Sequence, residues 1–186
     1  MMRPIVDLFG DIVSKVSDAL VNDFQALDSH ISGVHYQHGH ILEIVDLLTQ
    51  KDQSQKYKYD KYPLVALLQD FPERITADSN RFVEANLNIL IVKSTLEEYT
   101  ADKRYDKNFK PFLYPIYNEL LKQINKSAYT LTYSPYRIRH TKIDRLFWGR
   151  QGRYGNTANI ANDKLDAIEI QNLNLKFIRE KCLLTK

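Results

Sequence analysis

An apolar stripe near the N-terminus constrains the fold more than any other feature of the sequence. Large apolar side chains recur there at steps of three and four residues, which places them on one side of an α-helix. The stripe consists of Ile5, Leu8, Phe9, Ile12, Val13, Val16, Leu20, Phe24 and Leu27. Pro4 suits the first turn of this helix, and Ser32 followed by Gly33 predicts its end. Such a helix must bury its apolar side, and a β-sheet is the simplest partner.

Three segments with the character of β-strands follow this helix. Residues 41–48 are aliphatic apart from Glu43 and Asp46. Residues 62–71 are similar, and they carry a proline where a strand begins. Residues 86–91 alternate with a period of two, as a half-buried strand does. We therefore expect these three segments to enter one sheet.

A polar linker, residues 51–61, joins the first two of these segments. This arrangement predicts a long β-hairpin with an exposed tip. The tip carries lysines together with Tyr57 and Tyr59, and it has no apolar anchor. We expect a neighbouring molecule to order it, which makes both tyrosines candidate interface residues.

A second helical region extends from about residue 102 to residue 126. Pro111 and Pro115 interrupt its apolar spacing. Either the main helix starts near Pro115, or a short helix breaks there and resumes. Residues 129–139 then predict a strand or an extended arm, and residues 144–162, with three glycines, predict an irregular loop.

The last strand contains a change of phase. Its apolar residues first occupy even positions and then odd ones: Ile168 and Ile170, followed by Leu173, Leu175 and Phe177. Side chains of a strand alternate between two faces, so one strand cannot serve one core in both phases without an extra residue. We therefore predict a β-bulge at Gln171 and Asn172.

Together these elements predict an α+β fold forming a single domain over residues 1–186. We expect a mixed, mostly antiparallel sheet of about four to five strands, with the N-terminal amphipathic helix and a second helix packed on one face. A chain of 186 residues can bury one sizeable core, whereas two domains would be crowded. Its composition, 44% hydrophobic and 26% charged, is that of a globular protein.

Composition excludes several other classes. No stretch approaches the roughly 18 consecutive apolar residues of a membrane-spanning helix. Asp7 interrupts the apolar run that a signal peptide would need. The single cysteine, Cys182, cannot form a disulfide within the chain. The formal net charge of +3 does not on its own favour a nucleic-acid or membrane partner.

No catalytic or cofactor motif is found in the sequence. Phosphate-binding GxxxxGK[ST], dinucleotide-binding GxGxxG, nucleophile-elbow GxSxG and zinc-binding HExxH patterns are absent. The pair Glu97 and Glu98 fits a solvated face, and Asp166 and Glu169 fit the outer side of the last strand. Catalytic carboxylates need burial or crowding instead. We expect no enzyme and no cofactor.

Three histidines fall close together in the segment HYQHGH. The three are His35, His38 and His40, and on a strand His38 and His40 point to the same side. A zinc site needs three or four ligands, but His30 and His140 are isolated and do not complete the set. We expect histidines that face solvent or an interface, and no metal.

Basic and aromatic residues gather in residues 137–154. Six basic residues stand there against one acid: Arg137, Arg139, Lys142, Arg145, Arg150 and Arg153 against Asp144. Arginines among aromatic residues can bind nucleic acid, or they can form the centre of a protein interface. The low net charge favours the interface. Its candidate residues are Phe147, Trp148, Arg150, Arg153 and Tyr154, in a loop too irregular to bury the first two. A nucleic-acid-binding module using residues 137–154 is the alternative.

Three stretches together resemble the tail-terminator and tail-completion (head–tail connector) proteins of tailed bacteriophages. They are YPLVALLQDFPE (62–73), YDKNFKPFLYPIYNELLKQINKS (105–127), and RLFWG (145–149) with DKLDAIEIQNLNLKF (163–177). The resemblance implies a structural virion protein whose small α+β subunit closes into a ring. This ring would lie in the tail or neck, between the capsid-side connector and tail components, with DNA only passing through its channel. A terminator on a tail tube and a neck ring of a short-tailed phage both remain open.

Overall fold

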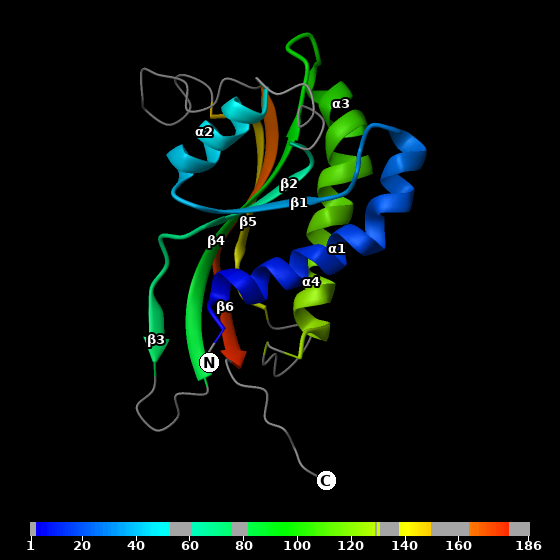
Figure 1. The fold of residues 1–186 in the computed structure, drawn as a ribbon. Helices are drawn as coiled ribbons and strands as arrows, with labels where there is room; N and C mark the ends of the chain where they lie inside the picture. Colours follow the sequence, from blue (N-terminus) through cyan, green and yellow to red (C-terminus); the bar gives the residue numbers. More distant parts are fainter. Residues whose placement is uncertain are drawn as a thin grey trace.

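The computed structural model describes residues 3–52, 61–75, 82–128, 130, 138–149 and 164–178. Within this part of the chain, six strands form one sheet with helices on both of its faces (Figure 1). The strands lie in the order β1-β2-β4-β6-β5, and β3 pairs with β4 beside this path. Their bounds are His35–Gly39 (β1), Leu64–Leu68 (β2), Glu73–Ile75 (β3), Phe82–Ser94 (β4), Thr141–Trp148 (β5) and Leu165–Ile178 (β6).

The sheet is mixed and mostly antiparallel, as expected. Only β1 and β2 pair in parallel among the described strands, and every other pair is antiparallel. The α+β fold is confirmed. The described sheet has six strands instead of four to five because β1, β3 and β5 lie outside the segments expected to form strands, whereas the expected segment 41–48 contributes none.

Helix α1 (Ile5–Leu27) confirms the N-terminal stripe. Its buried residues pack on the sheet, and Pro4 occupies the N-cap position. The helix ends before the predicted stop: the Asp28 N–H still makes a helical bond to the Phe24 carbonyl, but the backbone of Asp28 is extended. Leu27, the last member of the stripe, is 60% exposed.

Helix α2 (Ile41–Asp52) overturns the prediction of a strand over residues 41–48. His40 caps it: His40 Nδ1 accepts from the Leu42 N–H at 3.3 Å, and Glu43 Oε2 accepts from the His40 N–H at 3.2 Å. The bond from Glu43 back to His40 is that of a capping box, whereas the histidine accepts from the second N–H of the helix instead of the third. Its aliphatic residues also fit helical spacing, and Ile44 and Leu48 pack on the sheet.

The predicted hairpin over residues 51–61 is therefore wrong as well. The linker joins α2 to β2, and the strand that pairs with β2 is instead β1, from the histidine segment. Tyr57 and Tyr59 lie outside the described residues.

The second helical region runs through both prolines. It consists of α3 (Ala101–Arg104), the π-helical segment η1 (Tyr105–Leu113) and α4 (Tyr114–Lys126). The first alternative holds, since α4 begins next to Pro115, but the chain ahead of it is helical too. Pro111 is accommodated where the turns are wide: the Tyr114 N–H bonds to the Phe109 carbonyl, five residues back.

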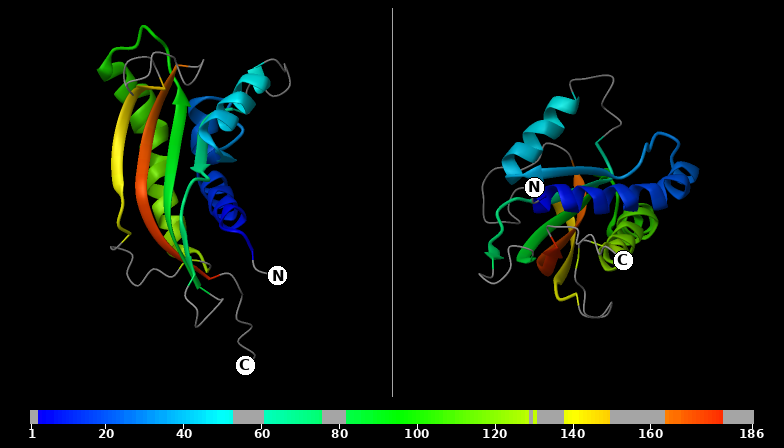
Figure 2. Two further views of the ribbon diagram at one scale, coloured as in Figure 1. Left: turned by 90° about the vertical axis from the view of Figure 1, so that its left-hand side faces the viewer. Right: turned by 60° about the horizontal axis from the view of Figure 1, so that its bottom comes forward.

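The two faces of the sheet carry separate cores. Helices α1 and α4 and segment η1 cover one face, and α2 covers one end of the other (Figure 1). Strand β1 lies between α1 and α2 (Figure 2). Alternate residues of β4 serve the two cores, since Ile91 belongs to the first and Val92 to the second.

Strand β5 corrects the expected loop over residues 144–162. Residues 144–148 belong to β5, which pairs with β6 at Asp144, Arg145 and Trp148, and residues 150–162 lie outside the described part. Of the predicted strand or arm over residues 129–139, the structure describes Thr130, which forms an isolated bridge with Phe177, and residues 138 and 139.

The β-bulge in β6 is confirmed. Leu87 pairs with Leu173 and Ile89 with Ile170, so Gln171 and Asn172 together oppose one residue of β4. Asn172 has φ 55°, and its N–H bonds to Asn88 Oδ1 at 3.1 Å. The bulge keeps the five residues of the phase change, Ile168, Ile170, Leu173, Leu175 and Phe177, in the same core.

Deletion of Asn172 should move Leu173, Leu175 and Phe177 to the wrong face. The free energy of unfolding should fall by about 3 kcal/mol or more, as for misplaced core residues. Urea unfolding measures this. Asn172→Gly is the matched control, because glycine adopts a positive φ without strain and keeps the register. Equal stability of the deletion and the control would contradict the role of the bulge.

Candidate functional site

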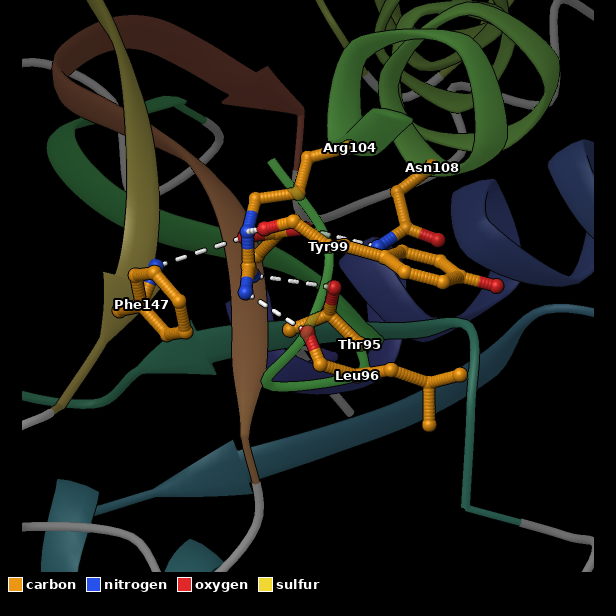
Figure 3. Close-up of polar contacts among 7 residues, drawn as sticks. Thr95, Leu96, Tyr99, Arg104, Asn108 and Phe147 are labelled. Carbon is orange, nitrogen blue, oxygen red and sulfur yellow. Dashed lines mark hydrogen bonds and ion pairs between the residues drawn. The ribbon is translucent and has the colours of Figure 1, made fainter. Parts of the chain in front are cut away.

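A buried ion pair lies where the helical region meets the sheet. Arg104 Nη1 contacts Asp166 Oδ1 at 3.0 Å, and the two side chains are 1% and 0% exposed. Figure 3 shows Arg104 among the residues that surround this pair, Asn108 and Phe147 included. The prediction that Asp166 faces outward is wrong. Asp166 has the same parity as Ile168 and Ile170, so it shares their buried face, and this signal was present in the sequence.

Arg104 uses its remaining donors on the loop that follows β4. Nη1 also donates to Thr95 Oγ1 at 3.0 Å, and Nη2 donates to the Leu96 carbonyl at 2.7 Å. Nε donates to the Tyr99 carbonyl at 2.9 Å. One guanidinium therefore fixes residues 95–99 against the sheet.

Asp166 completes the network toward η1 and β5. Its Oδ2 accepts from Asn108 Nδ2 at 2.7 Å, and its Oδ1 accepts from the Phe147 N–H at 3.4 Å. The Arg104 guanidinium carbon lies 3.4 Å from the centroid of the Phe147 ring, a cation–π contact. Phe147 has φ 53°, so these contacts hold the end of β5 in a left-handed conformation.

The network frames an open cavity of about 510 Å³, which we call the Lys93 cavity. Thr95, Leu96, Tyr99 and Asn108, all held by Arg104 or Asp166, belong to its lining. The rest of the wall is Leu27, Asp28, Lys93, Ser94, Asp106, Lys107, Pro111 and Phe112. The cavity is therefore bounded by the end of α1, by η1 and by the loop after β4.

Lys93 is the unusual group of this cavity. Its ammonium lies 4.9 Å from the centroid of the Phe112 ring. Burial lowers the pKa of Lys93, and the nearby charge of Asp28 partly opposes this. The charge of Asp106 is occupied elsewhere, by Lys110 at 2.9 Å. Lys93 is therefore a desolvated cation at the wall of a cavity open to solvent.

Trp148 lies on the opposite face of the sheet. It is buried in the core under α2, and its Nε1 donates to Glu169 Oε1 at 2.9 Å. Arg145 Nε contacts the other oxygen of Glu169 at 3.0 Å. The expectation that the segment is too irregular to bury Trp148 is wrong, and so is the outward placement of Glu169, which is 8% exposed.

Phe147 and Trp148 thus point to opposite faces, each held by a carboxylate of β6. Phe147 is half-buried, under Arg104. The other candidates of this segment, Arg150, Arg153 and Tyr154, lie outside the described residues, so their role in an interface stays a prediction.

The histidines of β1 make local contacts. His38 Nδ1 lies 2.9 Å from Gln69 Oε1, and His40 caps α2. Within the described part of the chain, no three His, Cys, Asp or Glu side chains form a metal-binding group. Among the helices described, none combines the length and the apolar character needed to cross a bilayer.

The chain matches no protein-family model, no curated protein and no solved structure.

Replacing Arg104 by Met should leave Asp166 as an uncompensated buried charge. The free energy of unfolding should fall by about 3–5 kcal/mol. Adding Asp166→Leu should restore part of this loss, because no charge is then left buried. Urea unfolding of the single and double variants measures both effects.

Lys110→Ala is the matched control, since it removes an ion pair from the exposed side of the same helical region. It should leave stability almost unchanged. If Lys110→Ala lowered the free energy of unfolding as much as Arg104→Met does, burial would not be the reason that the Arg104–Asp166 pair matters for stability.

The lowered pKa of Lys93 predicts a pH dependence. Below the usual lysine pKa of 10.5, the unfolded chain binds the proton of Lys93 more tightly than the folded protein does. The free energy of unfolding should therefore rise as pH increases toward that value. Lys93→Met should flatten the rise and Lys107→Met should not, as measured by thermal unfolding across the alkaline range. Identical slopes in all three proteins would contradict the burial of a charged amine.

Proposed function

We propose that the chain is a structural, ring-forming subunit of the neck or tail of a tailed bacteriophage. In this role it joins the capsid-side connector to tail components, and it works by assembly, without catalysis or a cofactor. It is made in the host cytoplasm and functions in the virion. The resemblance of residues 62–73, 105–127 and 145–149 with 163–177 to tail-terminator and tail-completion proteins supports this proposal, and so does the α+β fold.

The observation that carries the proposal is a pair of exposed apolar surfaces on opposite faces of the sheet. One lies at the Lys93 cavity, where Leu27 is 60% and Leu96 49% exposed. The other lies on α2, where Leu42 is 56% and Leu47 41% exposed. A ring needs two different, complementary surfaces on each subunit, because its contacts are heterologous.

The charges of β5 favour protein contacts over nucleic acid. Lys142 contacts Asp144 at 2.5 Å, and Arg145 contacts Glu169 at 3.0 Å. Both belong to the basic segment 137–154, and both are compensated within the subunit. A phosphate backbone attracts clusters of uncompensated basic side chains.

Purified protein should form symmetric rings, alone or together with candidate neck or tail proteins. Native mass spectrometry gives the copy number, and negative-stain electron microscopy gives the symmetry. A persistent monomer that binds none of these proteins would refute the proposal. Salt-sensitive binding of DNA or RNA by such a monomer would support the nucleic-acid alternative instead.

A further inference from the structure

We propose that helix α2 of one copy of the chain docks into the Lys93 cavity of the next copy. This inference rests on the proposed function, since it names the contact through which the subunits of a ring would join. It combines the two apolar surfaces into one interface. The occupant of the cavity is thus a second copy of this chain.

The outward side of α2 combines leucines with acids. Leu42 and Asp46 are four residues apart, as are Glu43 and Leu47, and residues at this spacing are neighbours on a helix surface. Leu42, Glu43, Asp46 and Leu47 are all exposed. The helix thus presents two leucines with carboxylates between them, whereas Ile44 and Leu48 pack on the sheet.

The Lys93 cavity offers the complementary groups. Leu27 and Leu96 provide exposed apolar surface, and Lys93 and Lys107 provide positive charge. Because Asp106 is paired with Lys110, Asp28 alone opposes the two lysines of the lining.

Charge complementarity therefore selects the acidic side of α2 as the occupant. The side chain of Asp46 makes no hydrogen bond or ion pair with any other residue of the described part of the chain. Its carboxylate can pair with Lys93 or Lys107 of the next copy, while Leu42 and Leu47 cover Leu27 and Leu96. A carboxylate beside Lys93 would supply a partner for an amine that burial leaves poorly solvated.

The two surfaces stand back to back across β4. Val92 belongs to the core under α2, and Lys93, the next residue, lines the cavity on the other face. Each copy would therefore receive one neighbour on one face and enter another neighbour with the opposite face. Such head-to-tail contacts give a ring when the rotation between copies closes.

A symmetric contact between two α2 helices fits less well. It would place Glu43 and Asp46 against the same acids of the partner, and facing like charges oppose association. It would also leave the Lys93 cavity unused. The geometry therefore favours a heterologous pair of surfaces over an isologous one.

Complementation between two assembly-deficient variants tests the pairing. Leu47→Asp disables only the α2 surface, and Leu96→Asp disables only the cavity surface. Each alone should dissociate to monomers, with a dissociation constant raised roughly 30-fold or more, the loss of a hot spot. Mixed one to one, they retain one intact contact, so native mass spectrometry should detect a heterodimer and no ring.

Ile75→Asp provides the matched control. Ile75 on β3 is 57% exposed but belongs to neither surface, so this variant should assemble like the wild type. A charge exchange gives a second, independent readout. Asp46→Lys should weaken assembly, and Lys107→Asp in the same chain should restore it.

The outcomes separate this inference from the proposed function. Wild-type rings that survive both Leu47→Asp and Leu96→Asp would overturn the inference and leave the function standing. Two monomeric variants that form no heterodimer when mixed would overturn the pairing of these surfaces. If wild-type rings form only with a partner protein, the same variants are tested on that assembly. A wild type that forms no ring under either condition would overturn both proposals.

Discussion

The arrangement of the loop after β4, of η1 and of the end of β5 depends on the buried ion pair between Arg104 and Asp166. Removing two charges from water is unfavourable unless hydrogen bonds satisfy the remaining donors and acceptors. Here Thr95, Leu96, Tyr99, Asn108 and Phe147 supply them. The same contacts connect the loop after β4, the helical region, β6 and β5. The Arg104–Asp166 ion pair is stable only when all its hydrogen bonds are made. Because several of its partners line the Lys93 cavity, the pair also fixes the shape of that cavity.

The register of β6 makes this possible. Asp166 must face the helical side to meet Arg104, and Phe177 must face that side to reach the core. These residues have opposite parity, so the bulge at Gln171 and Asn172 reconciles the two requirements. On the other face, Glu169 holds Trp148 and Arg145. One strand thus anchors both faces of β5 while it completes the core beneath α1 and α4.

Local periodicity explains what the sequence predicts well. The apolar stripe of α1 is long enough that only helical spacing fits it. The change of parity along β6 is compatible with one core only if the strand contains a bulge. The aliphatic run 41–48 is short and fits both a strand and a helix, and its helical start depends on His40, an unusual cap. The burial of Asp166 follows from its parity with Ile168. Its partner Arg104 lies 62 residues away, and no local pattern connects them.

Exposed leucines and a desolvated lysine are unfavourable in an isolated subunit. Contact with a neighbouring copy would bury the leucines and give the lysine a partner. Leu27, Leu42 and Leu47 expose apolar surface to water, although other members of the same helices are buried, and so does Leu96 in the loop after β4. Lys93 is desolvated and makes no ion pair with a described carboxylate. A strand over residues 41–48 would have turned alternate side chains inward; a helix leaves an outward side with its own leucines and acids. Helix α2 therefore provides the second of the two surfaces on which the proposed head-to-tail assembly depends.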